Sequence, residues 1–209
     1  RGGRGGVGLA AARRALCTAF EETDTELLAR PVDGDAGSCA AVALVLPEHV
    51  VTAHAGDCRV VLWRAGVAVP LTADHRAGAP AEKARVETAG GFVAYGRVLG
   101  QLAVSRSFGD RAFKSIDVSG GGAGSEPRIA KLVTAAPDVA CVRWKPGDFL
   151  LIACDGVWDV MTDQEASDLI VDAYATLGSM QLAVEQLVHV VEHERRSTDN
   201  ITAIAVHLT

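Results

Sequence analysis

The sequence predicts an α+β fold, a layered sandwich of mostly antiparallel strands with helices grouped between them. Short runs rich in β-branched residues follow one another at hairpin spacing, which indicates antiparallel pairing. Helical patterns do not alternate one for one with strands, which argues against a doubly wound sheet. A length of 209 residues suits a single domain, and 49% apolar with 22% charged residues is ordinary for a globular protein.

A first helix is predicted over residues 9–29. Apolar side chains recur there at spacings of three and four, the period that places them on one helix face. These side chains are Leu9, Ala12, Leu16 and Phe20. Pro31 is expected to end the helix, because proline cannot continue its hydrogen bonding. The apolar face therefore predicts a partner surface elsewhere in the protein.

Four β-rich runs come next, separated by short turns. The runs cover residues 39–46, 49–55, 59–63 and 67–71. The turns between them are Pro47-Glu48, Gly56-Asp57 and Ala65-Gly66. Turns this short predict antiparallel hairpins between consecutive runs.

The middle of the sequence is predicted to hold one helix and one surface loop. The helix covers residues 80–89, with Pro80 at its first position and Gly90-Gly91 directly after its end. Residues 119–125 are glycine and serine with one alanine, so they have few side chains to pack and are expected to form a flexible loop.

The last third of the sequence is predicted to hold strands and helices in turn. Runs at residues 139–144 and 149–154 flank a Lys-Pro-Gly-Asp turn and are expected to form another hairpin. Thr162 and Glu165 match a capping box that begins a helix. The remaining elements are a helix over residues 180–195 and a closing strand over residues 201–208.

The net charge and the cysteine content indicate which classes of partner and which cellular compartment to expect. A formal net charge of −6 argues against nucleic acid and anionic membranes as partners. Five cysteines without a C-x-x-C pair indicate reduced thiols, not a disulfide framework. The longest apolar run is far shorter than a membrane span, and no signal peptide is recognisable. We expect an intracellular, cytoplasmic or nuclear monomer.

Residues 1–8 are predicted to be a glycine- and arginine-rich end or linker remnant, and residues 9–209 the domain itself. Arg-Gly-Gly repeats also occur in RNA-binding tails. One short copy on an acidic chain favours the linker. Because no methionine opens the sequence, we expect a piece of a longer protein.

Two aspartates lie next to predicted strands. Asp155 directly follows the run at residues 149–154, and Asp199 precedes the closing strand. If these strands are antiparallel neighbours, both carboxylates lie at the same sheet edge. Clustered carboxylates repel one another unless a cation neutralises them, and Mg²⁺ and Mn²⁺ prefer oxygen ligands. The pattern favours a metal site, although an Asp-Gly pair after a strand is also a common turn.

Six sequence blocks occur in one order along the chain and together resemble the signature blocks of the PPM-type, or protein phosphatase 2C-like, protein serine/threonine phosphatases. The resemblance runs from about Leu16 to the C-terminus. The blocks begin with Gly56-Asp57-Cys58-Arg59, Leu71-Thr72-Ala73-Asp74-His75 and Glu87-Thr88-Ala89-Gly90-Gly91, and continue with Leu102 to Asp110, Cys154 to Asp159 and Asp199-Asn200-Ile201-Thr202.

This resemblance implies a fold, a metal site and a reaction. The fold would be a β-sandwich of two antiparallel sheets flanked by helices, in α-β-β-α layers, with its first strands missing here. Asp155 and Asp199 match ligands of a dinuclear Mg²⁺ or Mn²⁺ site, and Asp74 and, less closely, Asp159 match positions linked to a third ion. No catalytic residue beyond these ligands is implied. The substrates would be phosphoserine and phosphothreonine proteins, hydrolysed by a metal-activated water.

One block of the family has no counterpart in the sequence. The early Asp-Gly-His-Gly-Gly block supplies the bridging aspartate and a histidine, and an arginine upstream of it holds the phosphate. Residues 1–8 carry no acid that could replace this block. We therefore expect weak or no hydrolysis from this chain alone. The alternative is a non-catalytic pseudophosphatase that binds phosphoproteins or regulates a partner.

Other motifs suggest competing sites. Residues 189–193 fit H-x-x-E-H, an inverted zinc-peptidase motif, but little chain follows to supply a third ligand, which favours surface or core histidines. Ser105 lacks the G-x-S-x-G context of a nucleophile. Arg106 has two interpretations, a loop-orienting role or a salt bridge to a neighbouring acid. Cys154 is expected to be a buried strand residue.

Overall fold

The structure is a computed structural model that describes residues 8–30, 35–119 and 128–209. Its described residues form two compact units. The first unit takes its residues from Arg1–Ala40, Ala55–Asp57 and Asp74–Asp138, and the second from Ala41–His54, Cys58–Ala73 and Val139–Thr209. Most of the predicted N-terminal linker, the proline expected to end the first helix and most of the glycine-rich loop lie outside the described residues. A single domain over residues 9–209 stays a prediction.

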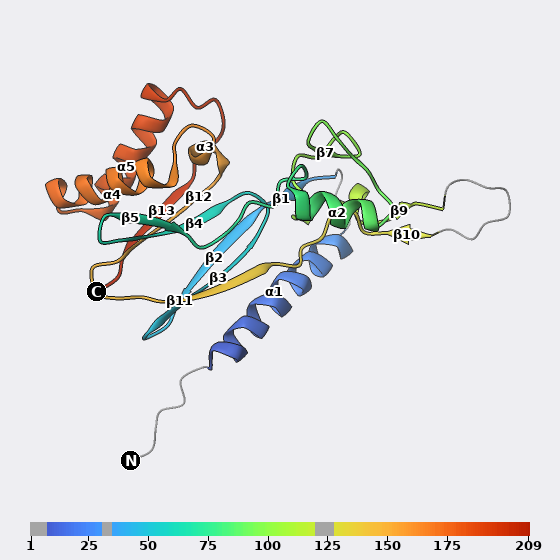
Figure 1. Cartoon of the computed structure of the whole chain (residues 1–209), viewed down its shortest axis with the longest axis horizontal. Helices are drawn as coiled ribbons and strands as arrows, with labels where there is room; N and C mark the ends of the chain where they lie inside the picture. The colour runs from blue at the N-terminus through green and yellow to red at the C-terminus, as the bar shows by residue number, and fades with distance from the viewer. Residues whose placement is uncertain (1–7, 31–34, 120–127) are drawn as a thin grey trace, which may run out of the picture. The chain divides into compact units, whose positions relative to one another are not determined.

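The second unit contains a four-stranded antiparallel sheet in the order β13-β12-β4-β5 (Figure 1). Its strands are β4 (Arg59–Arg64), β5 (Val67–Pro70), β12 (Phe149–Ala153) and β13 (Ala203–His207). Phe149 of β12 pairs with Trp63 on one side and His207 on the other. The aliphatic and aromatic side chains of β12 suit this central position, because both faces of the strand are covered.

A three-stranded sheet in the order β11-β3-β2 packs face to face on the four-stranded sheet. Its strands are β2 (Ala40–Val45), β3 (His49–Ala55) and β11 (Asp138–Arg143). Val50 from β3, Leu62 from β4 and Leu150 from β12 meet in the core between the sheets. Each is at most 1% exposed, so each contributes about 1.5–3 kcal/mol of burial. The predicted α+β architecture with two antiparallel sheets is confirmed.

Two of the predicted hairpins are wrong. β3 and β4 belong to different sheets, and so do β11 and β12. The short connections near Gly56-Asp57 and Lys145-Asp148 therefore cross between layers instead of turning back within one sheet. Sequence spacing cannot separate these two cases, because both need a short turn between apolar runs. The pairings of β2 with β3 and of β4 with β5 are confirmed.

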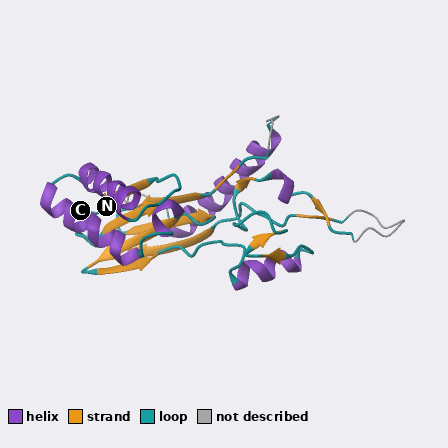
Figure 2. Ribbon diagram, turned by 90° about the horizontal axis from the view of Figure 1, so that it is seen from above, coloured by secondary structure: helices purple, strands orange, loops and turns teal. Residues whose placement is uncertain are grey.

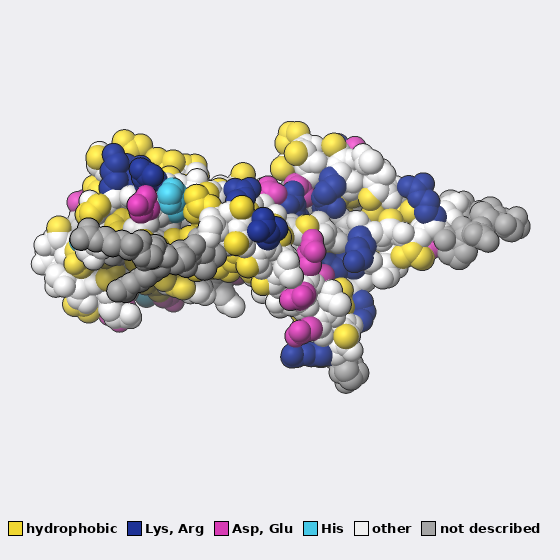
Figure 3. Space-filling model, turned by 90° about the horizontal axis from the view of Figure 1, so that it is seen from below, with side chains coloured by type: hydrophobic (Ala, Val, Ile, Leu, Met, Phe, Trp, Pro, Cys, Tyr) yellow, Lys and Arg dark blue, Asp and Glu magenta, His cyan; other side chains and the backbone are white. Residues whose placement is uncertain are grey.

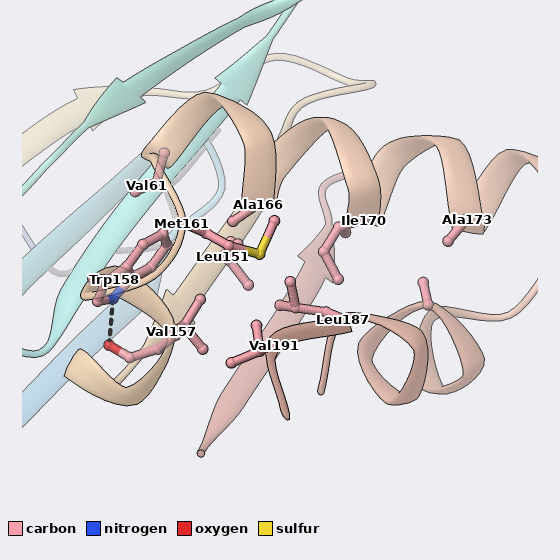
Figure 4. Packing of buried hydrophobic residues seen from close by; sticks show 12 residues of the cluster. Val61, Leu151, Val157, Trp158, Met161, Ala166, Ile170, Ala173, Leu187 and Val191 are labelled. Atoms are coloured by element: carbon pink, nitrogen blue, oxygen red, sulfur yellow. Dashed lines mark hydrogen bonds between the residues drawn. The ribbon is translucent and has the colours of Figure 1, made fainter. Parts of the chain in front are cut away.

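Helices cover the outer face of the four-stranded sheet (Figures 1 and 2). They are α3 (Asp155–Trp158), α4 (Asp163–Leu177), α5 (Met180–His189) and the π turn η2 (Val190–Glu194). Ile170, Leu187 and Val191 point into one cluster with sheet residues (Figure 4). The predicted capping box of Thr162 and Glu165 begins α4. The predicted helix over residues 180–195 is interrupted, since its last turn widens into the π turn.

The described residues of the first unit form the α-helices α1 and α2, short strand pairs and a core of their own. α1 (Leu9–Ala29) has the predicted bounds and buries Ala12 and Phe20 of its apolar stripe. The ring of Phe20 lies 5.1 Å from that of Phe108. α2 (Pro80–Thr88) begins with proline as predicted. The short elements are β1 (Gly37–Ser38), β6 (Val93–Ala94), β7 (Arg97–Val98), β8 (Phe108–Gly109), η1 (Arg111–Phe113), β9 (Ile116–Asp117) and β10 (Ile129–Ala130).

The surface carries charges of both signs. On the face shown in Figure 3, acidic and basic side chains are interspersed. None of the helices in the described ranges combines the length and the apolar character needed to cross a membrane.

Candidate functional site

Asp155 and Asp199 flank one edge of the four-stranded sheet. Asp155 is the first residue of α3, two positions after the end of β12, and Asp199 lies four positions before β13. β12 and β13 are antiparallel neighbours, with Ala153 opposite Ala203. The strand pairing that the prediction required is therefore present, and it brings the two aspartate-bearing segments to the same end of the sheet.

Cys154 ties these two segments together. Its Sγ donates to the Asn200 carbonyl oxygen at 3.2 Å, and the Thr202 backbone N–H donates back to Sγ at 3.3 Å. The Cys154 N–H donates to the Thr202 carbonyl at 3.1 Å. The thiol is only partly buried. The sequence prediction of a plain buried strand residue missed this role, because the contact joins residues 46 positions apart.

Two further hydrogen bonds stabilise the segments at this edge of the four-stranded sheet. The Ser197 hydroxyl donates to the Gly156 carbonyl oxygen at 2.8 Å, and the Asn200 N–H donates to Asp199 Oδ1 at 2.7 Å. A Cβ atom on Gly156 would lie 2.2 Å from the Asn200 carbonyl oxygen, so only glycine permits this approach. The close packing fixes α3, which carries Asp155, against the segment that carries Asp199.

Replacing Gly156 by alanine should separate these segments. We expect Gly156→Ala to lower the free energy of unfolding by about 1–3 kcal/mol, because the added methyl group meets backbone that cannot rotate away. Urea denaturation measures the change. The control is Gly78→Ala, where an added Cβ makes only an ordinary 3.4 Å contact and we expect a loss within about 0.5 kcal/mol. Equal losses in both variants would contradict the described packing.

Asp159 lies one helical turn after Asp155. It follows α3 as its C-cap, and its N–H donates to the Asp155 carbonyl at 2.8 Å. Residues four apart in a helix lie on the same face, so the two aspartates share one side of α3. Asp159 also lines an open pocket of about 630 Å³ together with Arg59 and Trp158.

Charged groups in this pocket are paired. The Arg59 guanidinium stacks over the Trp158 ring at 5.2 Å and forms an ion pair with Asp163. Glu165 accepts hydrogen bonds from the backbone N–H and hydroxyl of Thr162, and these together with Arg195 lower the pKa of Glu165 to about 2. The Glu165 carboxylate in the pocket wall is therefore ionised at neutral pH.

Asp74 belongs to the first unit. Its Oδ2 lies 3.5 Å from Nε of Arg76, and both residues line a pocket of about 450 Å³ with Gly78 and Ala103. The structure therefore does not bring Asp74 and the sheet-edge aspartates together within one unit. The third-ion role predicted for Asp74, and that for Asp159, stay predictions.

The donor set at the sheet edge suits a hard cation only in part. Asp155 and Asp199 offer carboxylate oxygens, which Mg²⁺ and Mn²⁺ prefer. Within the described ranges, no three His, Cys, Asp or Glu side chains are grouped as a metal site needs. The described residues thus supply a pair of ligand candidates and not a full set.

Comparisons with known proteins identify the family of the chain. The sequence profile of the Protein phosphatase 2C family matches residues 8–201. The chain belongs to the protein phosphatase 2C family. It is 37% identical over 177 residues to Protein phosphatase 2C homolog 2 of Schizosaccharomyces pombe, covering 83% of the chain and 46% of that protein. It is 37% identical over 196 residues to Probable protein phosphatase 1N of Mus musculus, covering 93% of the chain and 46% of that protein.

The fold comparison points to the same family. The crystal structure of serine-threonine phosphatase 2C from Toxoplasma gondii superimposes with a TM-score of 0.74 at 25% identity, covering 94% of this chain and 67% of that one. The chain spans about half the length of the curated phosphatase 2C relatives that it matches.

In this phosphatase 2C chain, Ser105 and Arg106 belong to a buried ion-pair network of the first unit. Arg106 Nη2 donates to Glu82 Oε1 at 2.6 Å, and Arg106 Nη1 donates to Asp138 Oδ1 at 2.8 Å. The Ser105 hydroxyl donates to Glu82 Oε2 at 2.6 Å. The salt-bridge interpretation of Arg106 is confirmed, and Ser105 is engaged as a hydrogen-bond donor. Sequence reasoning missed Glu82, since only the fold brings it to Arg106.

Proposed function

We propose that the whole protein hydrolyses phosphoserine and phosphothreonine in proteins with Mg²⁺ or Mn²⁺. The observation that carries the proposal is the placement of Asp155 and Asp199 at one sheet edge, on segments that Cys154 and Gly156 hold together. Two such ions would lower the pKa of a shared water and neutralise the phosphoryl oxygens. Family membership and the printed names of the relatives support the same reaction.

The residues of this chain would hold and orient the cations. Asp155 and Asp199 would supply carboxylate oxygens, and the Asn200 N–H would keep one oxygen of Asp199 turned towards the backbone. Asp159, one turn along α3, and Asp74 are proposed ligands of a weaker third ion. Water would occupy the remaining coordination positions, as is usual for Mg²⁺. No side chain of this chain is proposed to form a covalent phosphoenzyme.

We further propose that the 209-residue chain by itself is weak or inactive. The described residues offer no group of three ligands, and the sequence contains no Asp-Gly-His-Gly-Gly block. The same observation favours a second candidate, a non-catalytic module that binds phosphoproteins. We propose that either form is an intracellular monomer. The five free cysteines in the described residues support the intracellular part of this proposal.

Hydrolysis of a phosphothreonine peptide with Mn²⁺ tests the proposal. The proteins to compare are this chain, a longer form that includes any upstream Asp-Gly-His-Gly-Gly block, and that form with Asp155→Ala. We expect activity in the longer form and a loss of at least about tenfold in Asp155→Ala. Asp172→Ala, an exposed carboxylate on α4, is the matched control and should keep full activity. A folded but inactive longer form would leave only the binding module.

A further inference from the structure

Two histidines lie side by side on the last helical segment of the second unit. His189 ends α5 and His193 lies in the π turn that follows, and both side chains are exposed. Their ring centroids are 4.4 Å apart, with the ring planes at 24°. We propose that His189 and His193 form a two-histidine clamp for a divalent transition-metal ion that prefers imidazole, such as Zn²⁺ or Ni²⁺. The clamp is separate from the sheet-edge aspartates and does not depend on phosphatase activity.

The two rings lie next to each other because residues four apart share one face of a helical segment. In an α-helix, residues four apart are rotated by about 40° from each other. The wider π turn has fewer degrees per residue, and its hydrogen bond runs from the Arg195 N–H to the Val190 carbonyl oxygen at 2.9 Å. The π turn changes this rotation, and in the structure the two rings stack at 4.4 Å. Single π turns inside helices frequently occur at functional sites.

Hydrogen bonding prepares His193 to bind a metal through Nε2. Its Nδ1 lies 3.2 Å from the His189 carbonyl oxygen, which can only accept, so Nδ1 carries the hydrogen. The neutral ring then has its free lone pair on Nε2, and rotation of the exposed ring can turn this nitrogen towards an ion shared with His189. Glu192 Oε2, 3.8 Å from the same Nδ1, favours this tautomer. Metal-binding histidines usually make this kind of second contact, to a backbone carbonyl or a carboxylate.

The clamp differs from the peptidase centre that H-x-x-E-H suggests. Within the described ranges no third ligand joins the two histidines, so water would complete the coordination sphere. Two imidazoles select Zn²⁺, Ni²⁺ and Cu²⁺ over Mg²⁺ and Mn²⁺, which prefer oxygen. Zn²⁺ also binds thiolates, and the chain has five free cysteines. Ni²⁺ is therefore a more selective probe for the two histidines than Zn²⁺.

Calorimetric titration of the tag-free chain with NiCl₂, in excess Mg²⁺ and a reducing agent, tests the clamp. We expect one Ni²⁺ per chain, and an affinity at least about tenfold lower in His189→Asn and in His193→Asn. His49→Asn, on β3, is the matched control and should bind as the wild type does. Ni²⁺ should also raise the melting temperature of the wild type by about 3 °C and leave both single variants unchanged.

Two outcomes would overturn the clamp. One is the absence of saturable Ni²⁺ binding to the folded wild type. The other is wild-type affinity in either single variant, which would place the ion elsewhere. Melting curves recorded without metal show whether each variant is folded, and both histidines are exposed, so folding should be unaffected.

Discussion

Replacing Glu82 by glutamine should lower the free energy of unfolding by about 3 kcal/mol, the effect of breaking a buried ion pair. Glu82 lies on α2 and is only 5% exposed. Its two oxygens accept from Arg106, Ser105 and Arg85 at 2.6–3.1 Å. Glutamine keeps the size of the side chain but removes the charge, which leaves the Arg106 guanidinium half-buried without its closest carboxylate.

The same helix provides a matched control. Glu87 pairs with Lys83 at 3.8 Å, and both side chains are 49% exposed. Because water screens such a pair, Glu87→Gln should change the free energy of unfolding by no more than about 0.5 kcal/mol. Urea denaturation of both variants at neutral pH gives the comparison. Similar losses for Glu82→Gln and Glu87→Gln would show that the network contributes nothing beyond a surface pair.

The pH dependence gives an independent check on Glu82. Burial would raise the pKa of this carboxyl, but hydrogen bonds from Arg106 and Ser105 and the charges of Arg106 and Arg85 lower it from 4.5 to about 2. A lowered folded-state pKa stabilises the protein above the unfolded value and loses that contribution as the pH falls. The stability difference between wild type and Glu82→Gln should therefore shrink between pH 4.5 and about pH 2. A constant difference over this range would contradict the ionised, buried Glu82.

The Glu82–Arg106 network also shows which contacts the sequence alone does not predict. Local patterns located the strands closely, and β3 has the predicted bounds, because alternating apolar residues and turns act over a few positions. The placement of Asp155 and Asp199 followed from strands that are antiparallel neighbours. Glu82 and Arg106 are 24 positions apart and share no local pattern, so only the folded chain brings them together. The same holds for the layer changes after β3 and β11, which short turns do not reveal.

A second buried ion pair of the first unit should affect the free energy of unfolding at least as strongly as the Glu82 network does. Lys114 is 3% exposed, and its Nζ donates to Asp24 Oδ1 at 2.6 Å and to the Ser107 carbonyl oxygen at 2.8 Å. Asp24 Oδ1 also accepts from the Gly109 N–H at 2.9 Å. Burial lowers the pKa of Lys114, and the Asp24 carboxylate opposes this by favouring the charged ammonium. The pair thus links α1 to Ser107 and to β8.

We expect Lys114→Met to lower the free energy of unfolding by about 3–5 kcal/mol. Methionine fills a similar space, so the loss reports the buried carboxylates that lose their cation, Asp24 first and Asp110 beside it, and not a cavity. Asp24→Asn should also destabilise the protein, although asparagine keeps an oxygen for the Gly109 N–H. Urea denaturation of the two single variants and the wild type measures both losses.

The double variant Asp24→Asn/Lys114→Met separates the ion pair from the packing. With both charges of the pair removed, Asp24 is no longer a buried carboxylate without its cation, so the double variant should be more stable than the sum of the two single losses predicts. We expect a coupling energy of at least about 1 kcal/mol. Additive losses would mean that the two side chains act through packing alone, and that the charge of Lys114 does not hold α1 against β8.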